Sequence, residues 1–187
     1  MEVTKTSIDG LLVLRPRVFR DQRGYFFESF SQREFDEKVA PIRFVQDNES
    51  MSQRGVVRGL HYQRAPYTQT KLVRCVRGAV LDVAVDIRQG SPTYGQHVAV
   101  ELTEENQLQF FIPKGFAHGF AVLSETAVFE YKCDEFYHPE SEAGVSIMDP
   151  SLGIDWRTPL TEAILSEKDT RLPLLRDIEP WSAAALK

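Results

Sequence analysis

The sequence predicts a mainly β domain of the sandwich or barrel type. Apolar and polar residues alternate with a period of two, most clearly in Ala79–Ile87 and Thr126–Cys133, and this period is typical of strands with one buried face. Turn signals such as Asp21–Gly24 and Gln89–Pro92 separate these short runs. Many short strands with closely spaced turns are typical of sandwiches and barrels, and helical signals are few.

Ten segments carry the strand pattern. In chain order they are Leu11–Phe19, Tyr25–Phe30, Arg43–Ser50, Val56–Gln63, Thr70–Val76, Ala79–Ile87, Gln96–Leu102, Leu108–Ile112, Gly119–Leu123 and Thr126–Cys133. The capping box Ser31–Glu34 predicts a short helix that runs to about Val39. Thr158–Pro159 is typical of a helix start and predicts a helix over Leu160–Leu165, and Ser166–Asp169 can cap a further turn. We therefore expect a barrel-like domain with a short N-terminal helix and a helical C-terminal segment.

Length and composition exclude several classes of protein. The chain has 187 residues, of which 42% are hydrophobic and 26% charged, so we expect one domain over residues 1–187 with a full core. The net charge of −5 disfavours a nucleic-acid partner. No apolar run approaches the ~18 residues of a membrane helix, and Met1–Gly10 lacks the apolar core of a signal peptide. These features predict a cytoplasmic protein without a membrane partner, and the tail Ser182–Lys187 carries no motif.

Histidines and cysteines are the first candidates for metal ligands. They are His61, His97, His118, His138, Cys75 and Cys133. No two histidines form the H-x-H pair that a metal-binding barrel usually offers. Two cysteines are too few for a disulfide framework or a four-thiolate zinc site. We therefore expect no metal, and we expect the thiols to be buried and inert.

Two of the predicted strands turn a polar tip toward the interior. His118 shares a strand face with Phe120, and Tyr131 shares one with Phe129. Buried polar tips need hydrogen-bond partners or a ligand. Their convergence inside one barrel therefore predicts a candidate site.

Six segments, in order along most of the chain, match the motifs of one family. They are Gly24–Ser29, Phe44–Asn48, Arg58–Gln63, Ile112–Phe120, Asp149–Trp156 and Leu165–Asp169. Taken together they resemble the dTDP-4-dehydrorhamnose 3,5-epimerases. The resemblance implies a cupin-type double-stranded β-helix, that is, a jelly-roll barrel, which forms a homodimer with strands exchanged at the interface. It also implies that the enzyme needs no metal or organic cofactor.

The activity that this resemblance implies is the inversion of C3 and C5 of dTDP-4-keto-6-deoxyglucose. The C4 ketone acidifies the hydrogens on both carbons, so a base removes a proton and an acid returns one to the opposite face. By the resemblance, His61 is the base and Asp169 is its dyad partner. Tyr131 is the acid, and Lys71 is the cation near the C4 oxyanion. Tyr137 competes with Tyr131 for the role of acid, and sequence order alone does not decide between them.

The remaining matches concern substrate binding. By the resemblance, the diphosphate or sugar is bound by Arg23, Arg58 and Lys168, and the nucleoside and nearby hydroxyls are bound by Glu28, Gln46, Asp47 and Asn48. His118 forms a hydrogen bond to the sugar, Tyr137 stacks on thymine, and Glu142 makes a polar contact at the rim. Arg58 and His61 are three residues apart, so they face opposite sides of an ideal strand. Both can serve one site only if Gly59 marks a bulge or the strand twists sharply.

Alternative functions fit the same barrel. Related dTDP-sugar enzymes invert only C3 or only C5, or move the ketone as ketoisomerases, and the presence of Tyr131 favours the double inversion. A sugar-binding cupin without catalysis requires the set His61, Asp169 and Tyr131 to be incidental. A metal-dependent cupin oxygenase is disfavoured by the missing H-x-H pair. The segment Arg64–Thr70 carries no chemistry that we can interpret, and we expect it at the rim of the site.

Overall fold

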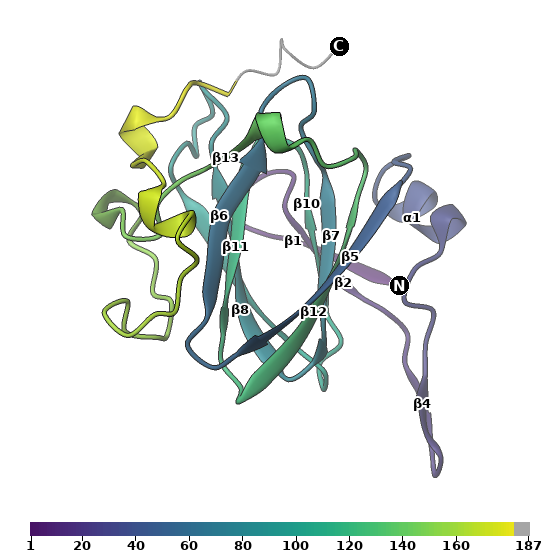
Figure 1. Ribbon diagram of the computed structural model, residues 1–187. Coiled ribbons are helices and arrows are strands. Elements are labelled where there is room, and N and C mark those ends of the chain that lie inside the picture. Colours follow the sequence, from purple (N-terminus) through teal and green to yellow (C-terminus); the bar gives the residue numbers. More distant parts are fainter. Residues whose placement is uncertain (182–187) are drawn as a thin grey trace.

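The fold is a barrel made of two antiparallel sheets (Figure 1). The computed structural model describes residues 1–181, so the tail 182–187, in which the sequence shows no motif, lies outside the described residues. One sheet has the strand order β1 (Glu2–Lys5), β2 (Leu12–Arg15), β10 (Gln109–Ile112), β7 (Lys71–Arg77), β12 (Thr126–Cys133) and β5 (Gln46–Gln53). The other has the order β13 (Glu142–Gly144), β6 (Val57–Gln63), β11 (Phe116–Val122), β8 (Ala79–Asp86) and β9 (His97–Thr103). The predicted mainly β barrel is confirmed.

Alternate residues of the strands fill the space between the two sheets. The inward face of β12 carries Ala127, Phe129 and Tyr131, as the period of two predicts. Phe129 is fully buried and stacks on Phe120 of β11, with the ring centroids 4.3 Å apart. Farther along the same face the interior becomes polar, because Lys71 of β7 lies beside Tyr131. This change from apolar to polar marks the candidate site.

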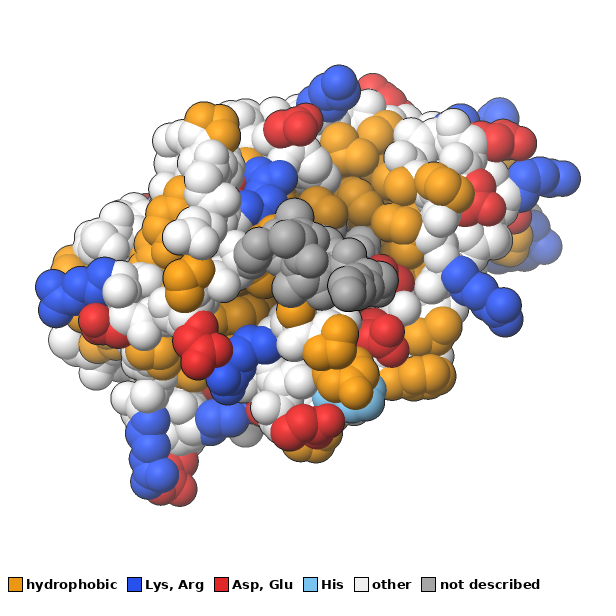
Figure 2. Space-filling view, turned by 90° about the horizontal axis from the view of Figure 1, so that it is seen from above, with side chains coloured by type: hydrophobic (Ala, Val, Ile, Leu, Met, Phe, Trp, Pro, Cys, Tyr) orange, Lys and Arg blue, Asp and Glu red, His pale blue; other side chains and the backbone are white. Residues whose placement is uncertain are grey.

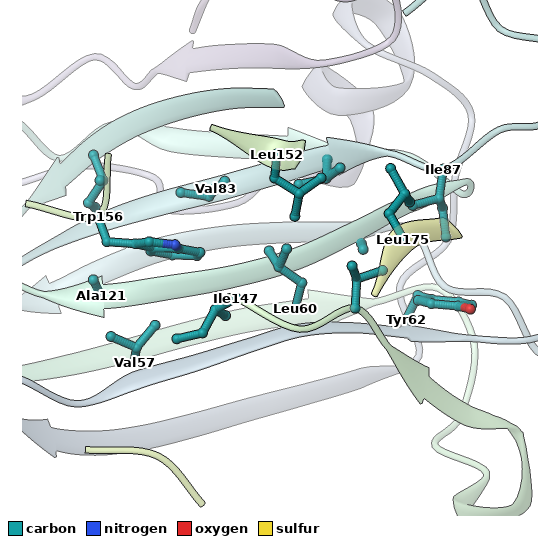
Figure 3. Close-up of a cluster of buried hydrophobic side chains, with 14 of the residues drawn as sticks. Val57, Leu60, Tyr62, Val83, Ile87, Ala121, Ile147, Leu152, Trp156 and Leu175 are labelled. Atoms are coloured by element: carbon teal, nitrogen blue, oxygen red, sulfur yellow. The ribbon is translucent and has the colours of Figure 1, made fainter. Parts of the chain in front are cut away.

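The C-terminal segment covers the outer face of the five-stranded sheet. Trp156, Leu152 and Ile147 pack in one cluster with Leu60 and Val83 of that sheet (Figure 3). Burying one large apolar side chain contributes about 1.5–3 kcal/mol. This packing holds the C-terminal segment against the barrel, and the 3₁₀ helix η3 (Asp169–Arg171) of that segment contacts β6.

The N-terminal helix α1 (Gln32–Lys38) confirms the predicted helix start. The Ser31 hydroxyl accepts a hydrogen bond from the Glu34 backbone N–H at 3.5 Å. Phe35 is buried on the outer face of the six-stranded sheet, where its ring centroid lies 5.6 Å from that of Phe111. The helix therefore covers part of this outer face.

The helix predicted over Leu160–Leu165 is wrong. These residues form a turn, and Ile164 joins the start of β6 as an isolated bridge. Its N–H donates to the Gly55 carbonyl at 2.8 Å, and its own carbonyl accepts from the Val57 N–H at 3.2 Å. A helix would need those backbone groups for its own bonds. Within the described residues, the helical content of the second half consists of short 3₁₀ helices: η1 (Pro139–Ser141), η2 (Pro150–Leu152), η3 and η4 (Leu175–Asp177).

The N-terminal arm leaves the barrel soon after its second strand. The ladder that the sequence predicts to continue to Phe19 ends at Arg15, because Pro16 has no N–H to donate. The next two strands, β3 (Phe19–Asp21) and β4 (Gly24–Phe26), form a hairpin that projects from the body of the molecule (Figure 1). Phe19, Tyr25 and Phe26 of this hairpin are exposed.

The surface mixes side chains of different kinds. Seen from above, acidic, basic and apolar side chains are interspersed (Figure 2). Within residues 1–181, no helix is both long and apolar enough to cross a membrane.

Candidate active site

A cavity of about 670 Å³ opens between the two sheets of the barrel. One wall comes from β5, β7 and β12, the other comes from β6 and β11, and the C-terminal segment adds further lining residues. Small-molecule sites commonly have volumes of about 300–1,000 Å³. The cavity is lined by nine residues that the sequence predicts for the site: Asn48, Arg58, His61, Lys71, His118, Tyr131, Glu142, Lys168 and Asp169.

His61 and Asp169 form a hydrogen-bonded pair in this cavity. The His61 Nε2 lies 2.6 Å from the Asp169 Oδ1. Burial opposes ionisation of the Asp169 carboxyl, but the hydrogen bond and charge of His61 outweigh it, so the pKa of Asp169 lies below its usual value. An ionised carboxylate only accepts, so Nε2 carries the hydrogen and Nδ1 is the nitrogen free to take a proton. The pair therefore has the geometry of an oriented base.

Arg58 and His61, which face opposite sides of an ideal strand, both line the cavity. The register of β6 against β11 shifts next to the cross-strand pair of His61 and His118. Gly59 has a φ of +119°, and a Cβ atom there would lie 2.6 Å from the Gly119 Cα. Of the two possibilities that the sequence left open, a bulge at Gly59 or a sharp twist of the strand, the register shift favours the bulge. Glycine is required there because a side chain would have no room and the φ is unfavourable for other residues.

Tyr131 and Lys71 enter the cavity from the opposite wall, on the neighbouring strands β12 and β7. The Lys71 Nζ lies 5.7 Å from the centroid of the Tyr131 ring. Burial raises the pKa of the Tyr131 phenol, so this residue keeps its proton at neutral pH and can donate it. Burial lowers the pKa of Lys71. The same burial reduces the screening of any charge that Lys71 carries.

A second imidazole–carboxylate pair lies beside the first, and sequence reasoning missed its carboxylate. The Asp82 Oδ2 lies 2.8 Å from the His118 Nε2. Asp82 is fully buried in β8, and burial raises its pKa although His118 opposes the rise. The signal was present in the sequence, since Asp82 alternates with Val80 and Ala84 on a face that belongs to the barrel core. An acid at such a position needs a partner.

Tyr137 lies at the rim and not in the cavity lining. Its hydroxyl donates to the Glu142 Oε2 at 2.9 Å, and its backbone N–H donates to the Gln46 Oε1 at 3.1 Å. Glu142 also accepts a hydrogen bond from Lys168. Burial opposes ionisation of Glu142, but the hydrogen bonds from Lys168 and Tyr137 outweigh it, so its pKa is lowered. Because Tyr131 alone of the two tyrosines lines the cavity, the geometry favours Tyr131 as the acid.

Three of the predicted binding residues lie away from this cavity within one chain. Arg23 lies in the projecting β3–β4 hairpin. Glu28 lines a separate cavity of about 650 Å³ beside α1. Asp47 faces outward from β5, and its carboxylate accepts hydrogen bonds from the Lys132 Nζ. The chain therefore does not bring these three side chains to its own candidate site.

The described part of the chain offers few ligands for a metal ion. Within residues 1–181, no three His, Cys, Asp or Glu side chains gather in a group that could hold one. Activity without a metal stays a prediction. Cys75 and Cys133 are buried free thiols, and burial raises their pKa values to about 12 and to about 11. Both thiols are protonated at neutral pH and are therefore poor nucleophiles.

Fold and site together define a class of protein: a jelly-roll enzyme with a candidate acid–base site, in which a His–Asp pair faces a tyrosine and a lysine across a cavity between the two sheets. The family model of dTDP-4-dehydrorhamnose 3,5-epimerase matches residues 5–177. The chain belongs to this enzyme family, and the resemblance found in the sequence is confirmed.

Relatives match this chain over most of its length. The dTDP-4-dehydrorhamnose 3,5-epimerase of Methanothermobacter thermautotrophicus is 52% identical, over 92% of this chain and 94% of that protein. The crystal structure of the 3,5-epimerase from Legionella pneumophila, in complex with dTDP-4-keto-L-rhamnose, is 52% identical. It has a TM-score of 0.92 and covers 95% of this chain and 94% of its own. The dTDP-4-dehydrorhamnose 3-epimerase of Streptomyces niveus is 39% identical, over 95% of this chain and 85% of that protein.

Proposed function

We propose that this protein inverts C3 and C5 of dTDP-4-keto-6-deoxy-D-glucose to give dTDP-4-keto-L-rhamnose, in dTDP-L-rhamnose biosynthesis. One observation carries the proposal. The oriented base His61 and the phenol of Tyr131 enter one cavity from opposite walls. Inversion needs this arrangement, because the proton leaves one face of a carbon and another arrives on the opposite face.

The chemistry follows from the C4 ketone. The His61 Nδ1 takes the proton from C3 or C5, and the electron pair of the C–H bond moves into an enolate with its charge on the C4 oxygen. Lys71 stabilises that oxyanion, while Asp169 stabilises the imidazolium that forms. Tyr131 then gives its proton to the opposite face of the carbon. Exchange of protons with solvent restores the imidazole and the phenol.

The rest of the cavity and its rim, where Gln46 accepts from the Tyr137 backbone N–H, would bind the nucleotide sugar. Arg58, whose Nε and Nη2 donate to the Ser52 hydroxyl at 3.1 and 3.0 Å, would hold the diphosphate together with Lys168. His118 would hydrogen-bond the sugar, Gln46 and Asn48 would contact the nucleoside, and Tyr137 would stack on thymine beside Glu142. Planar guanidinium forks suit phosphate oxygens, and aromatic faces suit bases.

The protein would act as a homodimer with strands exchanged at the interface. The projecting hairpin exposes Phe19, Tyr25 and Phe26, and an exposed apolar patch of this kind favours a protein partner. Arg23 and Glu28 lie outside the cavity of their own chain. In the dimer they would contact the substrate that is bound in the cavity of the second copy. We further propose a single cytoplasmic domain over residues 1–187 that works without metal or organic cofactor.

Proton NMR in D₂O tests the function directly. The purified protein is mixed with dTDP-4-keto-6-deoxyglucose in the presence of EDTA. Loss of both the C3 and the C5 proton signals is expected. Loss of the C3 signal alone would replace the proposal by the 3-epimerase activity for which the Streptomyces niveus relative is named. No loss of either signal would leave a sugar-binding cupin, whereas a ketoisomerase would remove the C3 signal and move the ketone away from C4.

A single variant tests the base. His61→Ala should abolish deuterium incorporation at both carbons while the thermal unfolding temperature stays close to that of the wild type. His97→Ala, on β9 and outside the cavity lining, is the matched control and should exchange at the normal rate. Exchange at the wild-type rate in His61→Ala would remove His61 from the mechanism.

A further inference from the structure

We infer that Gln63 is a positioning residue that holds the aromatic platform Tyr137 in place and thereby sets the affinity for the nucleobase. The inference rests on the proposed stacking of thymine on Tyr137. It concerns a residue two positions beyond the base His61 on β6, and it accounts for the segment Arg64–Thr70, which the sequence left without a role.

The side-chain amide of Gln63 makes three hydrogen bonds, and two of them flank Tyr137. Its Nε2 donates to the Phe136 carbonyl at 3.1 Å, and its Oε1 accepts from the His138 backbone N–H at 2.6 Å. The Nε2 also donates to the Tyr67 carbonyl at 2.8 Å. Gln63 is only 4% exposed, so these bonds are shielded from competing water. The amide is thus hydrogen-bonded to the backbone on both sides of Tyr137.

Tyr137 needs such support, because it does not itself belong to a strand. Residues 134–138 follow the end of β12 and belong to no strand or helix, and the Tyr137 side chain is 48% exposed. The Tyr137 hydroxyl donates to Glu142, which lies directly opposite Gln63 in the β6–β13 ladder. Both the backbone and the tip of Tyr137 are therefore fixed to the same pair of strands that carries His61.

The segment Arg64–Thr70 completes this support. Tyr67 stacks on His138, with ring centroids 3.6 Å apart and planes 13° from parallel. The Gln69 Nε2 donates to the Glu135 carbonyl at 2.9 Å, and the Thr70 backbone N–H donates to the Asp134 Oδ1 at 2.6 Å. The segment is thus bonded along its length to the residues on either side of Tyr137. Its role is to order the rim on which the nucleobase stacks.

The bonding pattern explains why an amide occupies position 63. Two carbonyls and one N–H face the side chain, so it must donate twice and accept once. Of the side chains of this length, only glutamine does both without a charge. A platform that is ordered before the ligand arrives costs less entropy on binding. Removal of the amide should therefore weaken the binding of ligands that contain the base and leave base-free ligands unaffected.

Gln63→Met removes all three hydrogen bonds at nearly constant volume, and Gln63→Glu keeps the acceptor but removes both donors. The binding of dTDP and of inorganic pyrophosphate is measured by calorimetry for each variant, and kcat and KM are measured by NMR. Gln53→Met, which alters an exposed glutamine at the end of β5, is the control. Tyr137→Ala and the double variant Gln63→Met/Tyr137→Ala complete a double-mutant cycle.

We expect the Gln63 variants to bind dTDP more weakly but pyrophosphate as tightly as the wild type does. One base–aromatic stack is worth about 5- to 150-fold in affinity, so Gln63→Met should raise the Kd for dTDP by at least about 5-fold. Its Kd for pyrophosphate and its kcat should stay within about 2-fold of the wild-type values. The double variant should bind dTDP no more weakly than Tyr137→Ala alone. Gln63→Glu should show the same difference between the two ligands, and it serves as the test if Gln63→Met does not fold.

Three other results overturn the inference in different ways. If Tyr137→Ala weakens dTDP binding and the Gln63 variants do not, Gln63 does not position the platform and the proposed stacking stands. If Tyr137→Ala leaves dTDP binding unchanged, the proposed stacking itself fails and the inference fails with it. Equal losses for dTDP and pyrophosphate in the Gln63 variants would indicate a general disturbance of the barrel and would also refute the inference.

Discussion

Asp169→Asn is the sharpest test of the acid–base site, because it changes one charge and almost no volume. Asp169 is 4% exposed and its Oδ1 lies 2.6 Å from the His61 Nε2. In the variant an amide replaces the carboxylate that stabilises the imidazolium. The amide can also turn its NH₂ toward Nε2, which would move the hydrogen of His61 to Nδ1, so that the nitrogen facing the substrate could no longer take a proton.

The geometry sets the size of the effect. Two unit charges 2.6 Å apart attract by about 6 kcal/mol at an effective dielectric constant of ~20. Much of this is lost, because the His61 side chain is 26% exposed and water replaces part of the interaction. A hydrogen bond to a charged group contributes a net ~1.5–3 kcal/mol, so the exchange rate should fall by about 10- to 150-fold.

The assay is deuterium exchange at C3 and C5, followed by NMR at saturating substrate. The Kd for dTDP is measured in parallel and should not change, because Asp169 contacts His61 and not the proposed nucleotide end of the cavity. Asp177→Asn, at an exposed position in η4, is the control. If Asp169→Asn exchanges both protons at the wild-type rate, the pair is structural and the proposed role of Asp169 is wrong.

Three further changes test other parts of the site and fold. Tyr131→Phe should still exchange solvent deuterium into the substrate by way of His61 but should lose net inversion, and NMR of the product sugar decides this. Asp82→Asn should lower kcat/KM by about 10-fold, because His118 loses a charged partner. Urea unfolding at pH 7 should show no loss of stability in that variant, because burial raises the pKa of Asp82 and ionisation there opposes folding. Asp86→Asn should lower the free energy of unfolding by about 2 kcal/mol at neutral pH. Burial raises the pKa of Asp86, but the hydrogen bonds from Arg88, Thr93 and Ser91 outweigh it and lower the pKa from 3.8 to about 2. Since the folded pKa is the lower one, this stability is present above pH ~4 and lost as the pH falls toward 2, which urea unfolding across that range would show.

Local pattern predicted most of the barrel because strand periodicity is itself local. Ala79–Ile87 and Thr126–Cys133 match β8 and β12 to within a residue. The irregularity of β6 also followed from a local conflict, since Arg58 and His61 could share a site only if Gly59 marked a bulge or the strand twisted sharply. Where an element depends on distant atoms, the pattern failed. Leu160–Leu165 has the start signals of a helix, but its backbone bonds to the beginning of β6.

The same distinction explains which site residues were found. His61 and Asp169 stand in motifs that can be read along the chain, and the family resemblance that these motifs carry supplied Lys71 and Tyr131. Strand alternation placed Asp82 on a core face, but its partner His118 lies 36 positions away, and only the structure shows that the two form a pair. The role inferred for Gln63 likewise comes from its contacts with the segment that carries Tyr137. Roles that arise from contacts between distant segments leave little trace in the sequence, and a structure is needed to find them.

The two-walled barrel also explains how one base and one acid could serve two carbons. C3 and C5 both adjoin C4, so both lie at the same bond distance from the ketone oxygen. The hydrogens on C3 and C5 of a sugar with the glucose configuration are both axial on the same face of the ring. If Lys71 fixes that oxygen, His61 on one wall can reach both hydrogens and Tyr131 on the other wall can reach the opposite face of both carbons. The walls belong to separate hydrogen-bonded sheets, so the base and the acid stay on opposite sides of the ring through both steps. An enzyme of this design needs no second set of catalytic residues for the second inversion.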